Sequence, residues 1–227
     1  MKLKLITLGL MISATLPCAA RDLTVGNATE LRTFLLTGRH ALAIEPIPAQ
    51  RGCGPGGCSI DLGSVSIMPS KGKLLDLTRN KTIKIRQQTS GTLPKLDWDP
   101  LGAYTVKYSG TQWGTCLEFT HAGLGKSGSF QRWISVILIP RQDSKPAPIA
   151  YRFVGYWASC DVIVEGRQPS EAILPTLEPV AKASDQLQIL WHSCTPLGCT
   201  TTKDSSTVSK VPSSENGSLQ IQRVKTQ

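Results

Sequence analysis

The chain lacks the sequence patterns by which common hydrolases and redox enzymes are recognised. Its 227 residues contain only three histidines, His40, His121 and His192. No Gly-x-Ser-x-Gly nucleophile elbow is present, and neither is the Cys-x-x-Cys pair used in redox catalysis. These absences argue against an enzyme, and we expect neither a cofactor nor a metal.

Long apolar runs are also missing, except at the start of the chain. Two lysines precede the apolar run of residues 5–16, and small residues follow it. This pattern predicts a signal peptide over residues 1–20, cleaved after Ala20. A lipoprotein signal with a lipid on Cys18 is the alternative. No later stretch is apolar enough for a transmembrane segment, so we expect a periplasmic or secreted protein.

Removal of the signal peptide leaves six cysteines, an even number, which in an exported chain indicates disulfide bonds. Four of them lie in two copies of the pattern Cys-x-Pro-x-Gly-Cys, at residues 53–58 and 194–199. The predicted pairs are Cys53–Cys58, Cys194–Cys199 and Cys116–Cys160. The alternative is a four-thiolate zinc site built from the two repeated pairs, and export argues against it.

Each copy of this pattern ends a similar series of predicted elements. A strand-like stretch that begins at Asp22 or Asp161 comes first, and a helix-like stretch and a second strand follow. The first cysteine lies 31 residues after Asp22 in one copy and 33 residues after Asp161 in the other. We infer an internal duplication of a β-α-β unit, over residues 21–58 and 161–199.

The two predicted helices have different signals. Asn27 and Glu30 have the spacing of a capping box, and an apolar stripe follows before Gly38 ends the helix. The second helix is expected at about residues 169–184. Pro175 and Pro179 interrupt it, so we expect it to be short or broken.

The middle of the chain has the strongest strand signal. Aromatic and β-branched residues bounded by Gly, Pro and Ser predict an antiparallel meander with four strands, at residues 104–108, 115–120, 132–139 and 149–156. Residues 88–102 contain two glycines and two prolines, which predicts a long loop.

The expected fold class is α+β and predominantly antiparallel β, with the meander bracketed by the two related units. The mature chain forms one disulfide-stapled domain over residues 21–202. Residues 203–227 are rich in Ser, Thr and Lys, which predicts a flexible tail with one weak strand at 219–223.

The two cysteine-closed turns are the first candidate binding surfaces. Proline and glycine in a four-residue loop favour a tight turn, and a loop held by a disulfide loses less entropy when it binds. The alternative is that the two turns only staple the tips of hairpins and have no role in binding. The candidate contact residues are Gly54, Pro55, Gly56, Gly57, Thr195, Pro196 and Leu197, with Trp98 and Trp113 in loops that we expect to be exposed.

A basic stretch is the second candidate surface. Residues 71–86 contain six basic side chains and one acidic one, and Lys84 and Arg86 alternate with two isoleucines. With Lys81, they predict either a surface for an anionic glycan or the cell envelope, or a solvated edge strand. The mature chain has 23 basic and 16 acidic side chains, a balance of +7. No nucleic-acid-binding motif is present, so nucleic acid is not an expected partner.

The leading hypothesis is therefore an exported, non-catalytic binding protein whose partner is another protein, such as an inhibitor or an immunity-type factor. The alternative is a carbohydrate or cell-envelope binding module. A second alternative is a carboxylate-dependent hydrolase that uses Asp97 or Asp99, which flank Trp98 in the sequence.

Overall fold

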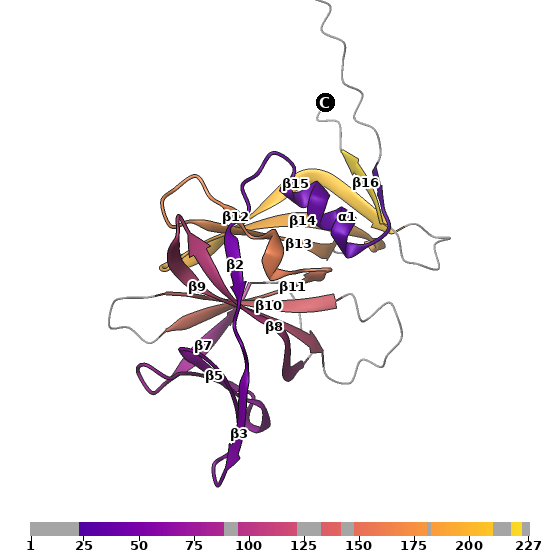
Figure 1. Cartoon of the computed structure of the whole chain (residues 1–227). Helices are drawn as coiled ribbons and strands as arrows, with labels where there is room; N and C mark the ends of the chain where they lie inside the picture. The colour runs from indigo at the N-terminus through magenta and orange to yellow at the C-terminus, as the bar shows by residue number, and fades with distance from the viewer. Residues whose placement is uncertain are drawn as a thin grey trace, which may run out of the picture.

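The described part of the chain forms two β-sheets and one α-helix (Figure 1). The structure is a computed structural model that describes residues 23–88, 95–121, 133–141, 148–180, 183–210 and 219–223. The predicted signal peptide and Cys18 lie outside the described residues. Among the described residues, α1 (Ala28–Leu36) is the one α-helix, and η1 (Pro69–Lys71) and η3 (Cys160–Val162) are short 3-10 helices.

The smaller sheet has six strands, and every neighbouring pair in it is antiparallel. In spatial order its strands are β1 (Leu23–Val25), β16 (Leu219–Arg223), β15 (Gly198–Lys210), β14 (Ala183–Thr195), β13 (Ala172–Val180) and β12 (Val164–Glu165). The first and last strands of the described chain therefore lie side by side.

The larger sheet has ten strands. In spatial order they are β2 (Ala43–Pro46), β8 (Leu96–Tyr108), β9 (Thr111–His121), β10 (Trp133–Pro140), β11 (Ile149–Tyr156), β7 (Lys81–Gln87), β6 (Lys73–Asp76), β5 (Val65–Met68), β4 (Gly57–Leu62) and β3 (Gln50–Gly54). Strands β8 to β11 form the predicted antiparallel meander. The pairing of β11 with β7 is parallel and was not predicted.

The ten-stranded sheet curls until its two edges meet. Its edge strands β2 and β3 are consecutive in the chain, separated only by residues 47–49. Ile47 N donates to Ala103 O at 2.8 Å, and Arg51 Nη2 lies 2.6 Å from Asp99 Oδ1. Both contacts join the β2–β3 segment to β8, so the chain itself closes the curl.

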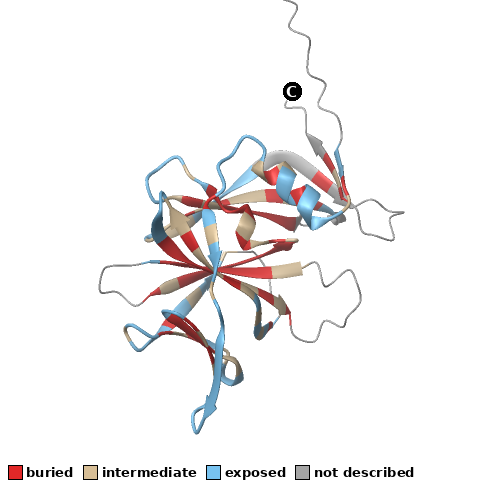
Figure 2. Cartoon of the chain, in the orientation of Figure 1, coloured by how far each residue is buried: buried red, intermediate tan, exposed pale blue. Residues whose placement is uncertain are grey.

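Strands β9 to β11 form a middle layer that is buried on both faces, whereas β8 beside them is buried only in part. Val136 and Leu138 pack in a cluster with side chains of β13 and β14, whereas Ile137 and Ile139 pack in a second cluster with side chains of β4 to β7. Figure 2 shows buried residues throughout this layer. Burial on both faces explains why β10 is apolar almost throughout, without the alternation of a half-exposed strand.

Helix α1 confirms the predicted capping signal. Asn27 Oδ1 accepts a hydrogen bond from Glu30 N at 2.9 Å, and Glu30 Oε2 accepts one from Gly26 N at 2.7 Å. Leu31 and Leu35 then carry the apolar stripe into the cluster between the two sheets. Gly38, with φ of 70°, follows the end of the helix.

The predicted second helix at residues 169–184 is wrong, because this segment contains β13 and the start of β14. Strand β12 pairs only with Ala172 and Ile173 at the start of β13. Beyond that point, one side of β13 has no neighbouring strand in the described sheet, so Pro175 and Pro179 lie in an edge strand, where proline is tolerated. The second copy of the duplicated β-α-β unit is therefore not observed.

Two further boundaries differ from the sequence prediction. Strand β8 begins at Leu96, inside the segment that we expected to be a loop, and residues 89–94 lie outside the described chain. The expected tail contains the end of β15 and the whole of β16, which pairs with both β15 and β1. Val208, Leu219 and Ile221 are buried, so these strands contribute to the core.

The close approach of β9 and β10 gives a stability prediction. Gly114 lies opposite Pro140, and a Cβ at residue 114 would collide with the carbonyl oxygen of Ile139 and lie 3.0 Å from Pro140 Cα. We expect Gly114→Ala to lower the free energy of unfolding by about 1–3 kcal/mol in urea denaturation. The control is Gly52→Ala, where nothing lies within 4 Å of the new Cβ, and it should change stability by less than about 0.5 kcal/mol. Equal effects of the two substitutions would contradict this packing.

Candidate functional site

All three predicted disulfides are present, and two of them close hairpin tips. Cys53 faces Cys58 at the end of the β3–β4 hairpin, and Cys194 faces Cys199 at the end of the β14–β15 hairpin. Because these cysteines are bonded in pairs, they do not form the four-thiolate zinc site. No group of three or more His, Cys, Asp or Glu side chains in the described part of the chain is placed to hold a metal ion.

The two stapled tips belong to different sheets. The β3–β4 hairpin extends from the curled sheet at the bottom of Figure 1, whereas β14 and β15 lie in the six-stranded sheet on the opposite side of the middle layer. The tips therefore do not form one continuous surface. Each has to be considered as a separate candidate site.

The β3–β4 tip projects into solvent without a large apolar side chain. Every residue from 48 to 58 is exposed, and a Cβ built on Gly54 or Gly56 would meet no atom within 4 Å. Gly57, with φ of 105°, takes the left-handed conformation that the turn requires. The predicted contact residues Gly54, Pro55, Gly56 and Gly57 are thus accessible, but they offer mainly backbone.

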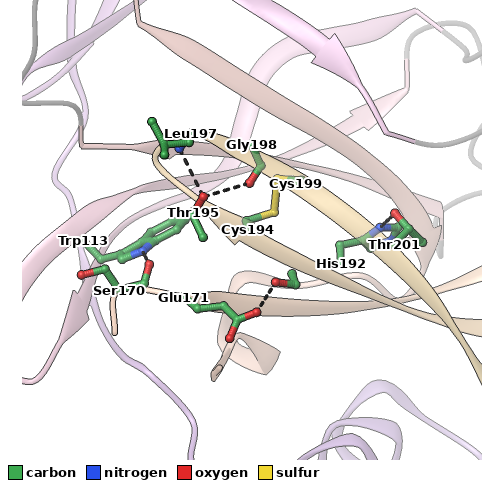
Figure 3. The surroundings of a disulfide bond; sticks show 11 residues. Trp113, Ser170, Glu171, His192, Cys194, Thr195, Leu197, Gly198, Cys199 and Thr201 are labelled. Carbon is green, nitrogen blue, oxygen red and sulfur yellow. Dashed lines mark hydrogen bonds between the residues drawn. A yellow bond between two sulfur atoms is a disulfide. The ribbon is translucent and has the colours of Figure 1, made fainter. Parts of the chain in front are cut away.

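The β14–β15 tip presents a large apolar side chain. Leu197 is 93% exposed, the highest value among the exposed large hydrophobic residues. Thr195 Oγ1 accepts a hydrogen bond from Leu197 N at 3.2 Å and donates one to Gly198 O at 3.3 Å (Figure 3). The Cys194–Cys199 disulfide lies directly below this turn. The tip is therefore held by a covalent bond and by two hydrogen bonds through one hydroxyl.

The segment before β13 supports this tip from the side. The carboxylate of Glu171 accepts hydrogen bonds from the hydroxyl of Ser193 and from Gln168 N, the latter at 2.9 Å. The bond from Ser193, followed by those from the backbone, lowers the pKa of Glu171 below its usual value, so the carboxylate stays charged. Trp113 Nε1 donates to Ser170 O at 2.7 Å, which ties the same segment to β9 (Figure 3).

Sequence reasoning missed the supporting residues Ser170, Glu171 and Ser193. Glu171 and Ser193 are 22 residues apart, and Trp113 and Ser170 are 57 residues apart. No local pattern links such positions, because β13 and β14 bring them together only after the sheet forms. One signal in the sequence could have pointed to Ser193: it directly precedes Cys194, a cysteine of a predicted disulfide.

The two tryptophans are not the exposed contact residues that we expected. Trp113 is only 4% exposed and acts as an anchor between β9 and Ser170. Trp98 is half-buried and packs edge-to-face on Phe119, with ring centroids 5.8 Å apart. Trp113 packs in the first core and Trp98 packs against the second. Neither ring therefore offers a free face on which a sugar could stack.

The basic residues of β7 do not share one face. Lys84 and Arg86 are exposed and alternate with Ile83 and Ile85, as predicted. Successive side chains of a strand point to opposite faces, so Lys81 lies on the same face as Ile83. Lys84 and Arg86 lie on the opposite face. Trp98 packs with Ile83 and Ile85 against the second core. The basic pair and the aromatic ring therefore point to opposite faces of the curled sheet.

The carboxylates of Asp97 and Asp99 are exposed, and Trp98 between them turns inward. Asp99 is engaged in the ion pair with Arg51, and Asp97 Oδ2 lies 3.5 Å from Thr120 Oγ1. These contacts join β8 to its neighbours, and none of the three histidines is among them. The geometry gives the carboxylates a structural role.

The three histidines lie in separate places. His40 is exposed, and its backbone carbonyl accepts a hydrogen bond from Glu165. His121 is buried at the end of β9, where its Nε2 lies 2.9 Å from Ser135 Oγ. Arg152 Nε donates to the same hydroxyl at 3.1 Å.

His192 is completely buried inside the six-stranded sheet. Its ring nitrogens lie 2.7 Å from Thr176 Oγ1 and 2.9 Å from Thr201 Oγ1. The hydroxyl of Thr176 also donates to Glu178 Oε1 at 3.1 Å. These contacts join β13, β14 and β15 in one polar network, in which each buried polar group has a partner.

No helix in the described part of the chain is long and apolar enough to cross a membrane. Comparison of the chain with protein-family models, with curated proteins and with solved structures gave no match.

The buried His121 predicts a pH dependence of stability. Burial, and then the positive charge of Arg152, lowers the pKa of His121 to about 4, whereas an unfolded histidine titrates near 6.5. As the pH falls from about 6.5 to about 4, the unfolded chain takes up a proton that the folded protein does not. The free energy of unfolding should therefore decrease across this window.

Urea denaturation at pH 7, 5.5 and 4 measures this effect. His121→Gln should flatten the dependence between pH 6.5 and 4, and His40→Gln, at an exposed position, should leave it unchanged. The same slope in His121→Gln as in the unsubstituted protein would show that another group is responsible.

Proposed function

We propose that the protein is an exported, non-catalytic binding protein that contacts a partner protein through the β14–β15 tip, in the manner of an inhibitor or an immunity-type factor. The observation that carries this proposal is the 93% exposure of Leu197 at the end of a stapled turn. Thr195 and Pro196 lie beside it in the same turn.

The tip combines the two properties that favour binding by a protruding loop. Burial of a leucine side chain in a partner contributes about 1.5–3 kcal/mol, and Leu197 gains nothing of this kind within its own fold. The disulfide and the two bonds of Thr195 already fix the turn, so little conformational entropy is lost on association.

The β3–β4 tip supports the same class of function as a second contact. Its glycines leave the backbone N–H and C=O groups accessible, and the Cys53–Cys58 bond holds the two strands together. A positive balance of charge on the mature chain favours association with an acidic partner.

The glycan and hydrolase alternatives gain no support from the arrangement of their residues. Trp113 is buried, and Trp98 lies on the opposite face of the sheet from Lys84 and Arg86. Asp99 is ion-paired with Arg51. None of these residues converges with a histidine or with another aromatic ring on one surface.

A pull-down with matched leucine variants tests the proposal. Leu197→Asp should weaken the complex with the partner recovered from periplasmic extract at least tenfold, because a charge would enter the apolar contact. The control is Leu101→Asp, because Leu101 is also exposed, at 59%, but lies on β8. Both variants should keep the free energy of unfolding within about 0.5 kcal/mol of the unsubstituted protein.

The dissociation constant of each variant is then measured with the purified partner. Equal affinity of Leu197→Asp and Leu101→Asp would contradict a role for the tip. Repeated failure to recover any partner with the unsubstituted protein would contradict the protein-binding function itself.

A further inference from the structure

Among the three disulfides of the described chain, Cys53–Cys58 is the one that lies at the surface. Both of its cysteines are exposed, as is every other residue from 48 to 58. Cys116, Cys160 and Cys194, by contrast, are completely buried. The accessible disulfide therefore sits near the end of the β3–β4 hairpin, which extends from the curled sheet at the bottom of Figure 1.

The Cys194–Cys199 bond provides a matched comparison within the same chain. Both bonds close a Cys-x-Pro-x-Gly-Cys turn, both join cysteines that face each other across a hairpin, and both span a sequence separation of 5. Their surroundings differ, because Cys194 belongs to the first core and Cys199 packs against it, half-buried. The fold therefore covers one of two similar bonds and leaves the other open to solvent.

Little side-chain material surrounds the Cys53–Cys58 bond. The residues between the two cysteines are one proline and three glycines, and a further glycine precedes Cys53. A Cβ built on Gly52, Gly54 or Gly56 would meet no atom within 4 Å. Thiol–disulfide exchange requires that a thiolate reach one of the bonded sulfur atoms, and the open space around these glycines permits such an approach.

The fold does not depend on this bond. It closes a loop of only a few residues, so it restricts the unfolded chain little. Cys53 and Cys58 belong to neither of the two core clusters of the described residues. Strand β3 is an edge strand that pairs with β4 alone in the described sheet. Opening of the bond would therefore release the tip and leave both cores intact.

We propose that the Cys53–Cys58 disulfide is a thiol–disulfide exchange site whose co-reactant is a thiolate. The incoming thiolate forms a bond with the sulfur of one cysteine, and the Cys53–Cys58 bond breaks. Its electron pair goes to the other cysteine, which leaves as a thiolate and takes a proton from water.

A second thiolate of the co-reactant completes the exchange. It attacks the sulfur of the co-reactant in the mixed disulfide and releases the remaining cysteine. The co-reactant is thereby oxidised to a disulfide, and the tip is reduced to two thiols. The chain has no Cys-x-x-Cys pair, so the tip is the substrate of this reaction and not its catalyst. The exchange does not involve the proposed contact of Leu197 with a partner protein.

Timed alkylation of the folded protein in reduced glutathione tests the selectivity of the exchange. Thiols are blocked with N-ethylmaleimide at successive times, and mass spectrometry of the peptides assigns each modified cysteine. The Cys53–Cys58 bond should open at least about tenfold faster than the Cys194–Cys199 bond, because Cys194 is completely buried. Equal rates for the two bonds, or faster opening of Cys194–Cys199, overturn the proposal.

The same measurement at an unfolding concentration of urea separates the effect of the fold from that of the turn sequence. In the unfolded chain the two bonds should open at rates within about threefold of each other, since both close loops of the same length. A difference of about tenfold that persists in urea would assign the selectivity to the turn residues. That result would overturn the role of the exposed hairpin.

A thiolate can come from a small thiol or from a dithiol protein, and a trapping experiment distinguishes these sources. The protein probe is thioredoxin with the second cysteine of its Cys-x-x-Cys pair replaced by serine, so that a mixed disulfide accumulates. It is compared with glutathione at equal thiol concentration. Faster formation of the protein complex assigns a dithiol protein, and faster formation of the glutathione adduct assigns a small thiol. Absence of both adducts overturns the proposal.

The double variant Cys53→Ser/Cys58→Ser is the matched control, because it removes the exposed bond and keeps the other two. It should form no adduct with either probe. It should also unfold at the same urea concentration as the unsubstituted protein, since the bond lies outside both cores. Adducts of equal yield in this variant would place the exchange at another disulfide and overturn the assignment. A clear loss of stability would show that the fold needs the bond, and would also overturn it.

Discussion

Burial of the β9–β11 layer on both faces is the constraint on which the rest of the structure depends. Side chains on one face of this layer pack under the six-stranded sheet, and side chains on its other face fill the curl of the ten-stranded sheet. The Cys116–Cys160 bond joins this layer to η3, next to the start of β12. A change in the register of any of these strands would disturb both cores at once.

This shared layer leaves the hairpin tips free of any role in the core. Leu197 and the glycines of the β3–β4 tip bury nothing in the described structure, so their conformations depend on the disulfides and on local bonds such as those of Thr195. The stable scaffold and the stapled tip therefore have separate physical origins. Residues of such a tip can vary without loss of the fold, as binding loops require.

Local signals predicted a large part of this fold, and long-range contacts account for what they missed. The disulfide pairs, the cap at Asn27 and the four meander strands follow from cysteine number, capping chemistry and residue type. The strand at residues 172–180 was mistaken for a helix because the lack of a neighbour on one side of Pro175 becomes visible only in the sheet. The burial of Trp113 and the contact of Glu171 with Ser193 depend on pairings between distant segments, which no spacing in the sequence reveals.

The central claim is that the six-stranded sheet, which packs on a doubly buried layer, carries a rigid, solvent-exposed tip. Backbone ¹⁵N order parameters of the free protein test it most directly. The account predicts values of about 0.85 at Thr195, Leu197 and Gly198, equal to those along β9 and β10. Values below about 0.6 at the tip, with β9 and β10 remaining rigid, would show that the turn is not preformed and would contradict the account.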